Sequence, residues 1–427
     1  MPDFEHSVPQ LILEVSDEES GFLGYVVIDC ILSGPAIGGV RMRDGLTLDE
    51  VAGLAREMTL KFAYLNIPRG GAKAGVIWRP SLSDEDRAMI FTAFGKNLGP
   101  ILTKGIYGPG EDMGTSSMDI YHMKRGAGIN INRPTSNTGR SGFYTALTVF
   151  TSAEKLADSL GLKLSDMRVA VEGLGKVGMS VAELFSDAGI KIIGISTIKG
   201  GIYNPDGIDI RRLMELKKEA GDEALNLYPD AEAITKESLL ALDADILIPC
   251  AGPYTITKEN VSQIKAKMVV PGANLSATAE AESLMFERGI HYIPGFVSNC
   301  GGVLFYAVSA HGFWGGNVER VMKNGFGRNV SYLIESSRNK HISLSQRAKE
   351  IAESNLKRLK QMTGIEQKDR LQQLQTQRQK PEKSIDSILW RFYKLSLKVR
   401  ASFLLRSFAT TYTEDKISME AIPWGDL

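Results

Sequence analysis

Alternating apolar and polar positions mark the start of the chain. Residues 9–16 (PQLILEVS) and 21–29 (GFLGYVVID) alternate with a period of two and are bounded by Asp, Glu and Gly, which predicts two strands. Residues 46–66 and 83–102 repeat their apolar positions every three or four residues, which predicts helices. A turn-rich segment, RPTSNTG, then precedes a long helix that begins near Gly142.

Both of the first predicted helices begin with capping residues. Thr47 is expected to be the N-cap of the first. Glu50, three residues later, completes the pattern of a capping box, in which each side chain bonds the main-chain N–H of the other. Ser83 is expected to cap the second, with Asp84 and Glu85 as first-turn acids that favour the helix dipole.

The pattern changes at residue 168. Residues 168–196 predict strand, glycine turn, helix and strand in succession. Residues 243–249, 267–274 and 291–295 are short apolar runs separated by helical stretches. Strands that alternate with helices form parallel sheets covered on both faces. The predicted fold class is therefore α/β: an N-terminal α/β domain, a Rossmann-type doubly wound domain and C-terminal helices.

The last part of the chain is basic. Residues 357–406 contain thirteen Lys or Arg and four Asp or Glu, and residues 384–408 carry apolar side chains at helical spacing. A basic amphipathic helix can lie on a membrane, bind a partner or pack on its own subunit. We favour packing on the subunit or on a neighbouring copy, because charged segments are usually solvated.

Composition narrows the class of protein. The chain is 43% hydrophobic and 23% charged with a formal net charge of zero, which predicts a globular, two-domain protein and no nucleic-acid partner. The three cysteines lack metal-ligand spacing, which favours a reducing compartment and no bound metal. No secretion signal and no apolar run long enough to span a membrane are found. We expect a cytoplasmic protein.

A glycine-rich turn is the clearest binding motif. Gly173, Gly175 and Gly178, with Lys176 and Val177 between them, directly follow a predicted strand and begin a helix. There the first glycine permits the turn, the second lets the main chain approach a pyrophosphate, and the third packs helix on strand. The free N–H groups of the helix N-terminus attract phosphate. These residues predict a dinucleotide site.

The following strand carries the residues that would distinguish the cofactors. It ends in Ser196 and Thr197, with Lys199 close behind. An NAD-specific site usually has an acid there, which accepts a hydrogen bond from the ribose 2′-hydroxyl. Without that acid a 2′-phosphate is not repelled, and the hydroxyls and the lysine could bind one. The predicted cofactor is NAD or NADP, with NADP slightly favoured.

Two lysines and one aspartate have unusual neighbours. Lys73 follows two glycines in a small, apolar run, IPRGGAKAGV. Lys61 lies late in a predicted helix, and Asp112 lies between glycines in YGPGEDMG. Taken singly, each is explained by a surface turn, a polar helix face or a turn residue. The alternative is that the glycines bring main chain close to a small ligand that Lys73 contacts.

Several motifs occur in an order that is typical of one family. MTLKFA, GGAKAG, GEDMGTSSMD and GLGKVG are followed by GGIYNPDGID, DILIPCA, IKAKMVVPGAN and SNCGGV. Together they resemble the glutamate/leucine/phenylalanine/valine dehydrogenase family. The resemblance implies NAD- or NADP-dependent oxidative deamination of an L-amino acid to the 2-oxo acid and ammonia, by a homo-oligomer. It also implies a substrate-binding and catalytic domain at 1–134, a Rossmann domain at 135–323, helices at 324–361 that pack back on the first domain, and an extension at 362–427.

The resemblance also assigns roles to single residues. Lys73 would be catalytic and activate a water, and Asp112 would relay protons to and from the amino nitrogen. Lys61 would bind the substrate α-carboxylate, and the glycines, Gly71 among them, would let the main chain approach the substrate. The nicotinamide would be positioned by three polar residues: Thr138, Asn274 and Asn299.

The residues expected to contact the substrate side chain depart from the glutamate pattern. In glutamate enzymes a lysine within GPxKGGxR meets the side-chain carboxylate and a serine after NxGGV supports it; this chain has Ile37 and Tyr306 there. A buried carboxylate facing Ile37 would lack its partner, at a cost on the order of several kcal/mol. The resemblance therefore favours the leucine, phenylalanine and valine branch, with an apolar or aromatic substrate in a pocket of Ile37, Gly110, Val303 and Tyr306. Core packing is the alternative for Tyr306.

Two other functions stay open. The chain could be a glutamate dehydrogenase with an atypical pocket, in which another cation such as Arg69 replaces the missing lysine. It could also be a non-catalytic nucleotide-binding protein that acts through its basic C-terminal helix. The presence of all three chemical residues argues against the second. In each case we expect no metal.

Overall fold

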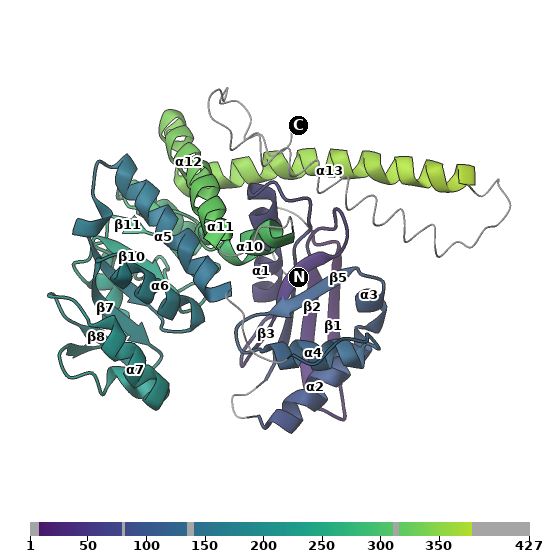
Figure 1. Cartoon of the computed structure of the whole chain (residues 1–427), viewed down its shortest axis with the longest axis horizontal. Coiled ribbons are helices and arrows are strands. Elements are labelled where there is room, and N and C mark those ends of the chain that lie inside the picture. Colours follow the sequence, from purple (N-terminus) through teal and green to yellow (C-terminus); the bar gives the residue numbers. More distant parts are fainter. Residues whose placement is uncertain (1–7, 79–81, 135–140, 311–315, 378–427) are drawn as a thin grey trace.

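The protein is represented by a computed structural model that describes residues 8–78, 82–134, 141–310 and 316–377. Two sheets dominate the architecture, one formed by the N-terminal part of the chain and one by its middle part, each with its own helices (Figure 1). This arrangement confirms the α/β fold class expected from the sequence.

The first sheet has five strands: β1 (Leu11–Asp17), β2 (Phe22–Ile28), β3 (Ala36–Arg43), β4 (Ala72–Ile77) and β5 (Tyr107–Glu111). Their order is β1-β2-β4-β3-β5, antiparallel from β1 to β4 and parallel from β4 to β5. One face packs against α1 (Leu48–Tyr64), and the other against α2 (Asp84–Asn97), α3 (Gly99–Thr103) and α4 (Ser117–Gly126). The two strands and the helix predicted over residues 9–66 are confirmed, and the single helix predicted over 83–102 is instead two helices, α2 and α3, with Leu98 between them.

The strand β2 shows why this sheet is covered on both faces. Phe22, Val26 and Ile28 pack with the apolar side chains of α2 and α4, whereas Val27 packs with α1. Because successive strand residues point to opposite faces, a strand that is apolar at nearly every position contributes to two cores.

The start of α1 confirms the predicted cap but not the predicted capping box. The Thr47 hydroxyl accepts a hydrogen bond from the Glu50 N–H at 3.2 Å. The Glu50 carboxylate binds two arginines of β3 instead of the main chain of Thr47. The capping box expected there is wrong, because guanidinium groups are stronger partners for a carboxylate than a main-chain N–H. At α2 the full box does form, between Ser83 and Asp86.

The second sheet has seven strands: β6 (Arg168–Glu172), β7 (Lys191–Thr197), β8 (Gly200–Tyr203), β9 (Glu232–Ile234), β10 (Ile246–Pro249), β11 (Met268–Val269) and β12 (His291–Tyr292). Their order is β12-β11-β10-β6-β7-β8-β9, parallel from β12 to β7 and antiparallel beyond. Its main helices are α5 (Ser141–Ser159), α6 (Lys176–Asp187), α7 (Ile210–Ala220), α8 (Ala279–Glu287), α9 (Gly295–Ser298) and α10 (Gly301–Ala310). Short 3₁₀ helices lie at Leu164–Asp166, Gly221–Leu225, Glu237–Ala241 and Val261–Gln263.

The strand order places the binding region of this sheet. From β6 the chain adds β7 and β8 on one side, and later β10, β11 and β12 on the other. Ligands of doubly wound sheets bind beyond the carboxyl ends of the strands at such a reversal. The glycine turn after β6 therefore lies at the expected place.

The C-terminal helices return to the first sheet. They comprise α11 (Gly316–Val321), a π-helical turn (Met322–Phe326), α12 (Gly327–Lys340) and α13 (Leu344–Gln377). On α13 the side chains of Asn355 and Arg358 donate hydrogen bonds to Ala63 and Asn66, at 3.1 and 3.0 Å. The helix continues beyond residue 362, where we had placed the start of the extension, and Figure 1 shows it running on past α1. The basic helix expected at 384–408 lies outside the described residues.

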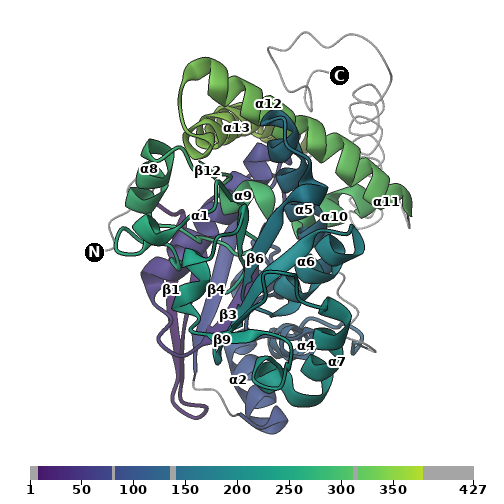
Figure 2. The same ribbon diagram turned by 90° about the vertical axis from the view of Figure 1, so that its left-hand side faces the viewer.

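One helix touches both halves of the molecule. α1 packs on β2 and β4 of the first sheet, and it also contacts α9 of the second unit (Figure 2). Among the described helices, none is long and apolar enough to cross a membrane. The C-terminal half of α1, buried from Glu57 to Tyr64, lies between the first sheet and α9 of the second unit.

Candidate active site

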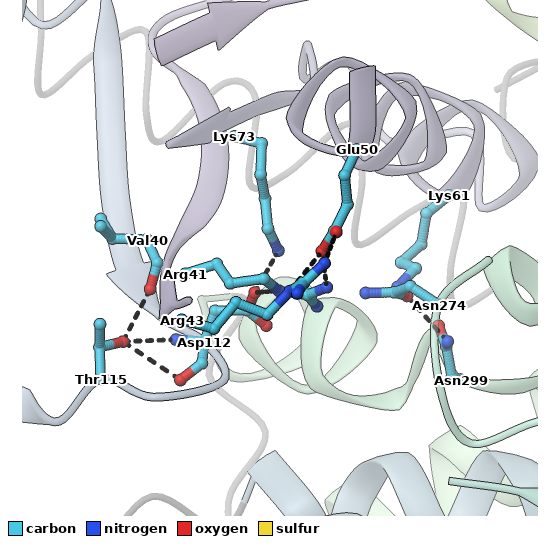
Figure 3. A network of polar contacts seen from close by, with 10 residues as sticks. All are labelled: Val40, Arg41, Arg43, Glu50, Lys61, Lys73, Asp112, Thr115, Asn274 and Asn299. Carbon is cyan, nitrogen blue, oxygen red and sulfur yellow. Dashed lines mark hydrogen bonds and ion pairs between the residues drawn. The ribbon is translucent and has the colours of Figure 1, made fainter. Parts of the chain in front are cut away.

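Three of the predicted residues come from elements that meet at this region. Lys73 lies on β4, Asp112 directly follows β5, and Lys61 lies in the last turn of α1. The Nζ atom of Lys73 is 2.9 Å from Oδ2 of Asp112. Both lysines are buried, and Figure 3 shows their side chains leaving β4 and α1 in the same direction. Buried lysines beside a charged partner are typical of functional sites, because burial and the partner shift their pKa values.

The two glycines before Lys73 are required by close packing within the protein. A side chain on Gly70 would collide with the Cys30 carbonyl, and one on Gly71 would collide with the main chain of α1 at Thr59. The Gly71 N–H donates to the Thr59 hydroxyl at 3.1 Å, and its carbonyl accepts from the Asp29 N–H at 3.0 Å. The expectation that Gly71 approaches the substrate is therefore not supported. The glycines instead seat β4, and with it Lys73, tightly against β2 and α1.

Two cations act on the carboxylate of Asp112. Arg41 Nε donates to Oδ2 at 2.8 Å, the same oxygen that Lys73 contacts. Burial opposes ionisation of Asp112, but Lys73 and then Arg41 outweigh it and hold the pKa of this carboxyl well below its usual range. Burial also lowers the pKa of the Lys73 ammonium; Asp112 opposes this effect and Arg41 adds to it. The site therefore favours an ionised acid beside a lysine that loses its proton readily.

Sequence reasoning missed the residues behind Asp112. The Arg41 guanidinium is 4% exposed, and its NH1 atom lies 2.9 Å from Oε1 of Glu50. Glu50 in turn binds Arg43. These groups form the chain of alternating charges drawn in Figure 3. The available signal was Arg41 at the end of GPAIGGVRM, a segment that we had used only for its Ile37.

A second lysine contact joins the two halves of the site. Lys61 Nζ donates to Oδ1 of Asn274 at 3.2 Å, and Asn299 Nδ2 donates to the same oxygen at 2.8 Å. Asn274 follows β11 and Asn299 ends α9, so both asparagines belong to the second sheet (Figure 3). Burial lowers the pKa of Lys61, opposed by Glu57. Thr138, expected beside these asparagines, lies outside the described residues.

The glycine turn has the geometry that its three positions require. Gly173 has a φ of +89°, in the region that favours glycine. A side chain on Gly178 would collide with the Gly173 carbonyl, so this position packs helix on turn. At Gly175, the N-cap of α6, no described atom lies within 4 Å of the place of a Cβ. The main chain there is open to an incoming group.

The two residues between these glycines differ in their surroundings. Lys176 is exposed, and its Nζ atom lies 3.5 Å from Oε2 of Glu111 on β5, so the contact spans the two sheets. Val177 is partly buried and packs against the core of the second sheet beside Gly272. Val177 can therefore bind a polar ligand through its main-chain N–H but not through its side chain.

The end of β7 differs from what the sequence suggested. Ser196 and Thr197 are buried, and the Thr197 hydroxyl accepts from the Lys199 N–H at 3.2 Å. Lys199 Nζ lies 3.2 Å from Oε1 of Glu223, in an exposed ion pair. Two of the groups considered for a 2′-phosphate, Thr197 and Lys199, therefore already have protein partners, and Glu223 adds an acid that sequence spacing did not reveal.

The four residues expected to form the side-chain pocket lie on three elements, β3, β5 and α10. Ile37 on β3 is partly buried and lies over Gly108, its partner on β5, while Gly110 has open space around it. On α10, Val303 packs against the core of the second sheet. Tyr306 is 71% exposed, so the alternative of core packing is wrong for it. The sheet and α10 thus each provide two of the four residues.

Comparison with known proteins identifies the family. The model described as Glutamate/Leucine/Phenylalanine/Valine dehydrogenase matches residues 138–364, and that of the Glu/Leu/Phe/Val dehydrogenase dimerisation domain matches residues 9–127. The chain belongs to this family. Glutamate dehydrogenase of Thermotoga maritima is 39% identical over 66% of this chain and 70% of its own length. NAD-specific glutamate dehydrogenase A of Halobacterium salinarum is 35% identical over 66% and 67%.

A solved structure agrees with this assignment. The hetero-hexameric glutamate dehydrogenase from Thermus thermophilus, in its leucine-bound form, gives a TM-score of 0.73 with 26% identity, covering 84% of this chain and 90% of that one. The present protein is thus an amino-acid dehydrogenase, an oxidoreductase that acts on CH–NH₂ groups with NAD or NADP.

The glycine turn of this dehydrogenase fits a dinucleotide. The open main chain at Gly175 meets the N-terminus of α6, and both lie where the strand order of the second sheet reverses. A helix N-terminus offers free N–H groups and a positive end to phosphate. The residues present therefore suit the family's cofactor.

Proposed function

We propose that this protein reversibly deaminates an apolar or aromatic L-amino acid to its 2-oxo acid and ammonia, with NAD or NADP. The observation that carries the proposal is the buried contact of 2.9 Å between Lys73 Nζ and Asp112 Oδ2. Beside it, Lys61 reaches across to Asn274 of the cofactor-binding half. The reaction needs a base, a proton relay and a cation for the α-carboxylate, and these residues supply all three.

Lys61 binds the substrate α-carboxylate. Its ammonium has three N–H donors, so it can keep its hydrogen bond to Asn274 while it holds an anion. Burial strengthens this attraction, because the pair forms where little water screens it. The α-carboxylate then fixes the substrate Cα between Lys73 and the cofactor.

Lys73 and Asp112 manage the protons. When bound, NAD or NADP would supply the acceptor for the hydride that leaves the substrate Cα. Lys73, as the neutral amine that burial favours, takes a proton from the water that attacks the imino carbon. Lys73 and Arg41 both occupy Oδ2 of Asp112, so we assign Oδ1 to the transfer of protons to and from the amino nitrogen.

The choice of substrate rests on charge. Ile37 offers no cation to a side-chain carboxylate. Arg69, considered as its replacement, donates its guanidinium to the Ser33 carbonyl. These observations support leucine, valine, phenylalanine or tryptophan. Glutamate is the second candidate, because the relatives described above are glutamate dehydrogenases.

The cofactor would be held mainly by the turn and by residues near the nicotinamide: Gly173, Gly175, Lys176, Val177, Gly178, Ser196, Thr197, Thr138, Asn274 and Asn299. We favour NADP slightly. The strand end has no acid, and the exposed Lys199–Glu223 pair is weak enough for a 2′-phosphate to replace Glu223. We further propose a cytoplasmic homo-oligomer with small-molecule substrates, since the matched N-terminal region is a dimerisation domain in its family.

A substrate panel tests the proposal. Purified protein is mixed with each L-amino acid and with NAD⁺ or NADP⁺, and the absorbance of the reduced nicotinamide is followed. Turnover of an apolar or aromatic amino acid supports the proposal. Turnover of glutamate alone supports the second candidate, and no turnover with any amino acid supports a non-catalytic role.

A further inference from the structure

One face of α1 meets the loop that follows β11. Gly53, Glu57 and Lys61 are four residues apart and form a stripe along the helix. Lys61 contacts Asn274, and Glu57 Oε1 accepts the N–H of the next residue, Leu275, at 3.1 Å. At Gly53 a Cβ would lie 3.2 Å from Leu275 Cδ1, so the missing side chain leaves room for the loop.

Leu275 is held at both of its main-chain groups. Its N–H is bound by Glu57, and its carbonyl accepts from the Tyr254 N–H at 2.6 Å. Its φ is +51°, a left-handed conformation that residues with a side chain seldom adopt. Such a conformation persists only where the surroundings fix it. Glu57 is one of the two groups that fix it here.

Glu57 is poorly suited to a purely stabilising role. Its side chain is 6% exposed, and no hydrogen-bond partner among the described residues reaches Oε2. Burial raises the pKa of this carboxyl, opposed by Lys61. A buried polar atom without a partner destabilises a fold, and at Oε2 this cost offsets the gain from the hydrogen bond between Oε1 and the Leu275 N–H. Retaining an acid here has a functional explanation.

We propose that Glu57 is a positioning residue that docks the 271–276 loop on α1 and so sets Asn274 against Lys61. The inference rests on the proposed function, in which Lys61 binds the substrate and Asn274 faces the cofactor. Docking fixes the distance between the two reactants, and reactions between bound partners depend steeply on that distance. Glu57 acts through Asn274 and does not itself touch the reacting atoms.

Hydrogen exchange tests the docking without any turnover. Glu57→Gln keeps an acceptor oxygen for the Leu275 N–H, whereas Glu57→Met does not. We expect the Leu275 amide to exchange about fivefold to tenfold faster in Glu57→Met and at the wild-type rate in Glu57→Gln, as for the loss of one hydrogen bond. Asp49→Asn, an exposed acid of the same helix, is the control. Equal exchange in all four proteins overturns the proposal.

Kinetics and thermal melting together show whether Glu57 positions the loop for the reaction or only stabilises the fold. In Glu57→Met we expect KM for the amino acid to rise about fivefold to tenfold, with little change in melting temperature because the lost hydrogen bond is offset by removal of the unpartnered Oε2, and Glu57→Gln to restore KM. Gly53→Leu, which fills the space of Leu275, should raise KM in the same way. A lower melting temperature with unchanged kinetics would make Glu57 a structural brace and refute the idea. If the wild type turns over no amino acid, the proposed function fails, while hydrogen exchange still decides the docking.

Discussion

Replacing Arg41 with methionine tests the proton chemistry assigned to the site. The guanidinium is buried between two acids, 2.9 Å from Glu50 and 2.8 Å from Asp112. Removing one partner from a buried ion pair typically costs about 3–5 kcal/mol of the free energy of unfolding, because the other charge loses its compensation. Lys73 still faces Asp112 and Arg43 still faces Glu50, so we expect the lower end, about 3 kcal/mol.

The same substitution should move the pH dependence of turnover. Arg41 lowers the pKa of both Lys73 and Asp112, so its removal raises both. Turnover requires neutral Lys73, and it therefore rises as pH passes upward through the pKa of this lysine. In Arg41→Met that rise should occur at higher pH. Arg41→Lys keeps the charge but lacks the planar guanidinium that reaches two acids. Its pH profile should therefore stay close to that of the wild type, while its kcat falls.

Two measurements decide this prediction. The first is the urea midpoint of each variant at constant pH, and the second is kcat for the best substrate across the alkaline range. Arg43→Gln is the matched control, because Arg43 binds Glu50 but not Asp112 in the contacts described above. A pH profile that stays in place in Arg41→Met, despite a lower urea midpoint, would show that Arg41 supports the fold alone and would refute the electrostatic reasoning.

Three further variants test separate assignments. Lys73→Ala should abolish turnover while fluorescence titration shows nearly unchanged cofactor affinity; wild-type rates would remove Lys73 from catalysis. Ile37→Lys should weaken the use of apolar substrates and improve that of glutamate, and unchanged kinetic constants would place Ile37 outside the pocket. Burial depresses the pKa of Lys61, so the charged side chain lowers the free energy of unfolding at neutral pH. This loss disappears as pH rises toward the unfolded lysine value of about 10.4. Lys61→Met should make the free energy of unfolding higher at pH 7 and less dependent on alkaline pH, and an equally steep dependence would contradict this.

The sequence predicted the features that depend on residues close together in the chain. The turn at Gly173 needs a positive φ, and Gly178 must lie close to main chain, so the sequence alone indicated strand, turn and helix. Contacts between distant residues have no such pattern. Lys73 lies on β4 and Asp112 directly follows β5, and only the family resemblance linked them. Their contact was thus expected from relatives, whereas the partner of Asp112 on β3 was not expected at all.

Three interpretations failed because a residue type can satisfy more than one environment. Glu50 has the spacing of a capping box, yet two arginines compete for it with stronger hydrogen bonds. Gly71 correctly signalled a close approach, but a glycine does not indicate which group approaches. For Tyr306, core packing was the alternative to a place in the substrate pocket, and its 71% exposure excludes that alternative.

The order of charges explains why Lys73, and not another lysine of the site, is suited to be the base. Along the network, Arg43, Glu50, Arg41, Asp112 and Lys73 alternate in sign, which leaves three cations against two acids. The excess is a single positive charge. Arginines do not lose a proton at any ordinary pH. Lys73, at the end of the network, is therefore the cation that can remove the excess charge by losing a proton. Its deprotonation makes the cluster neutral, which a buried site favours. Asp112 therefore stays ionised while the proton leaves from Lys73, and loss of Arg41 would raise the pKa of both groups.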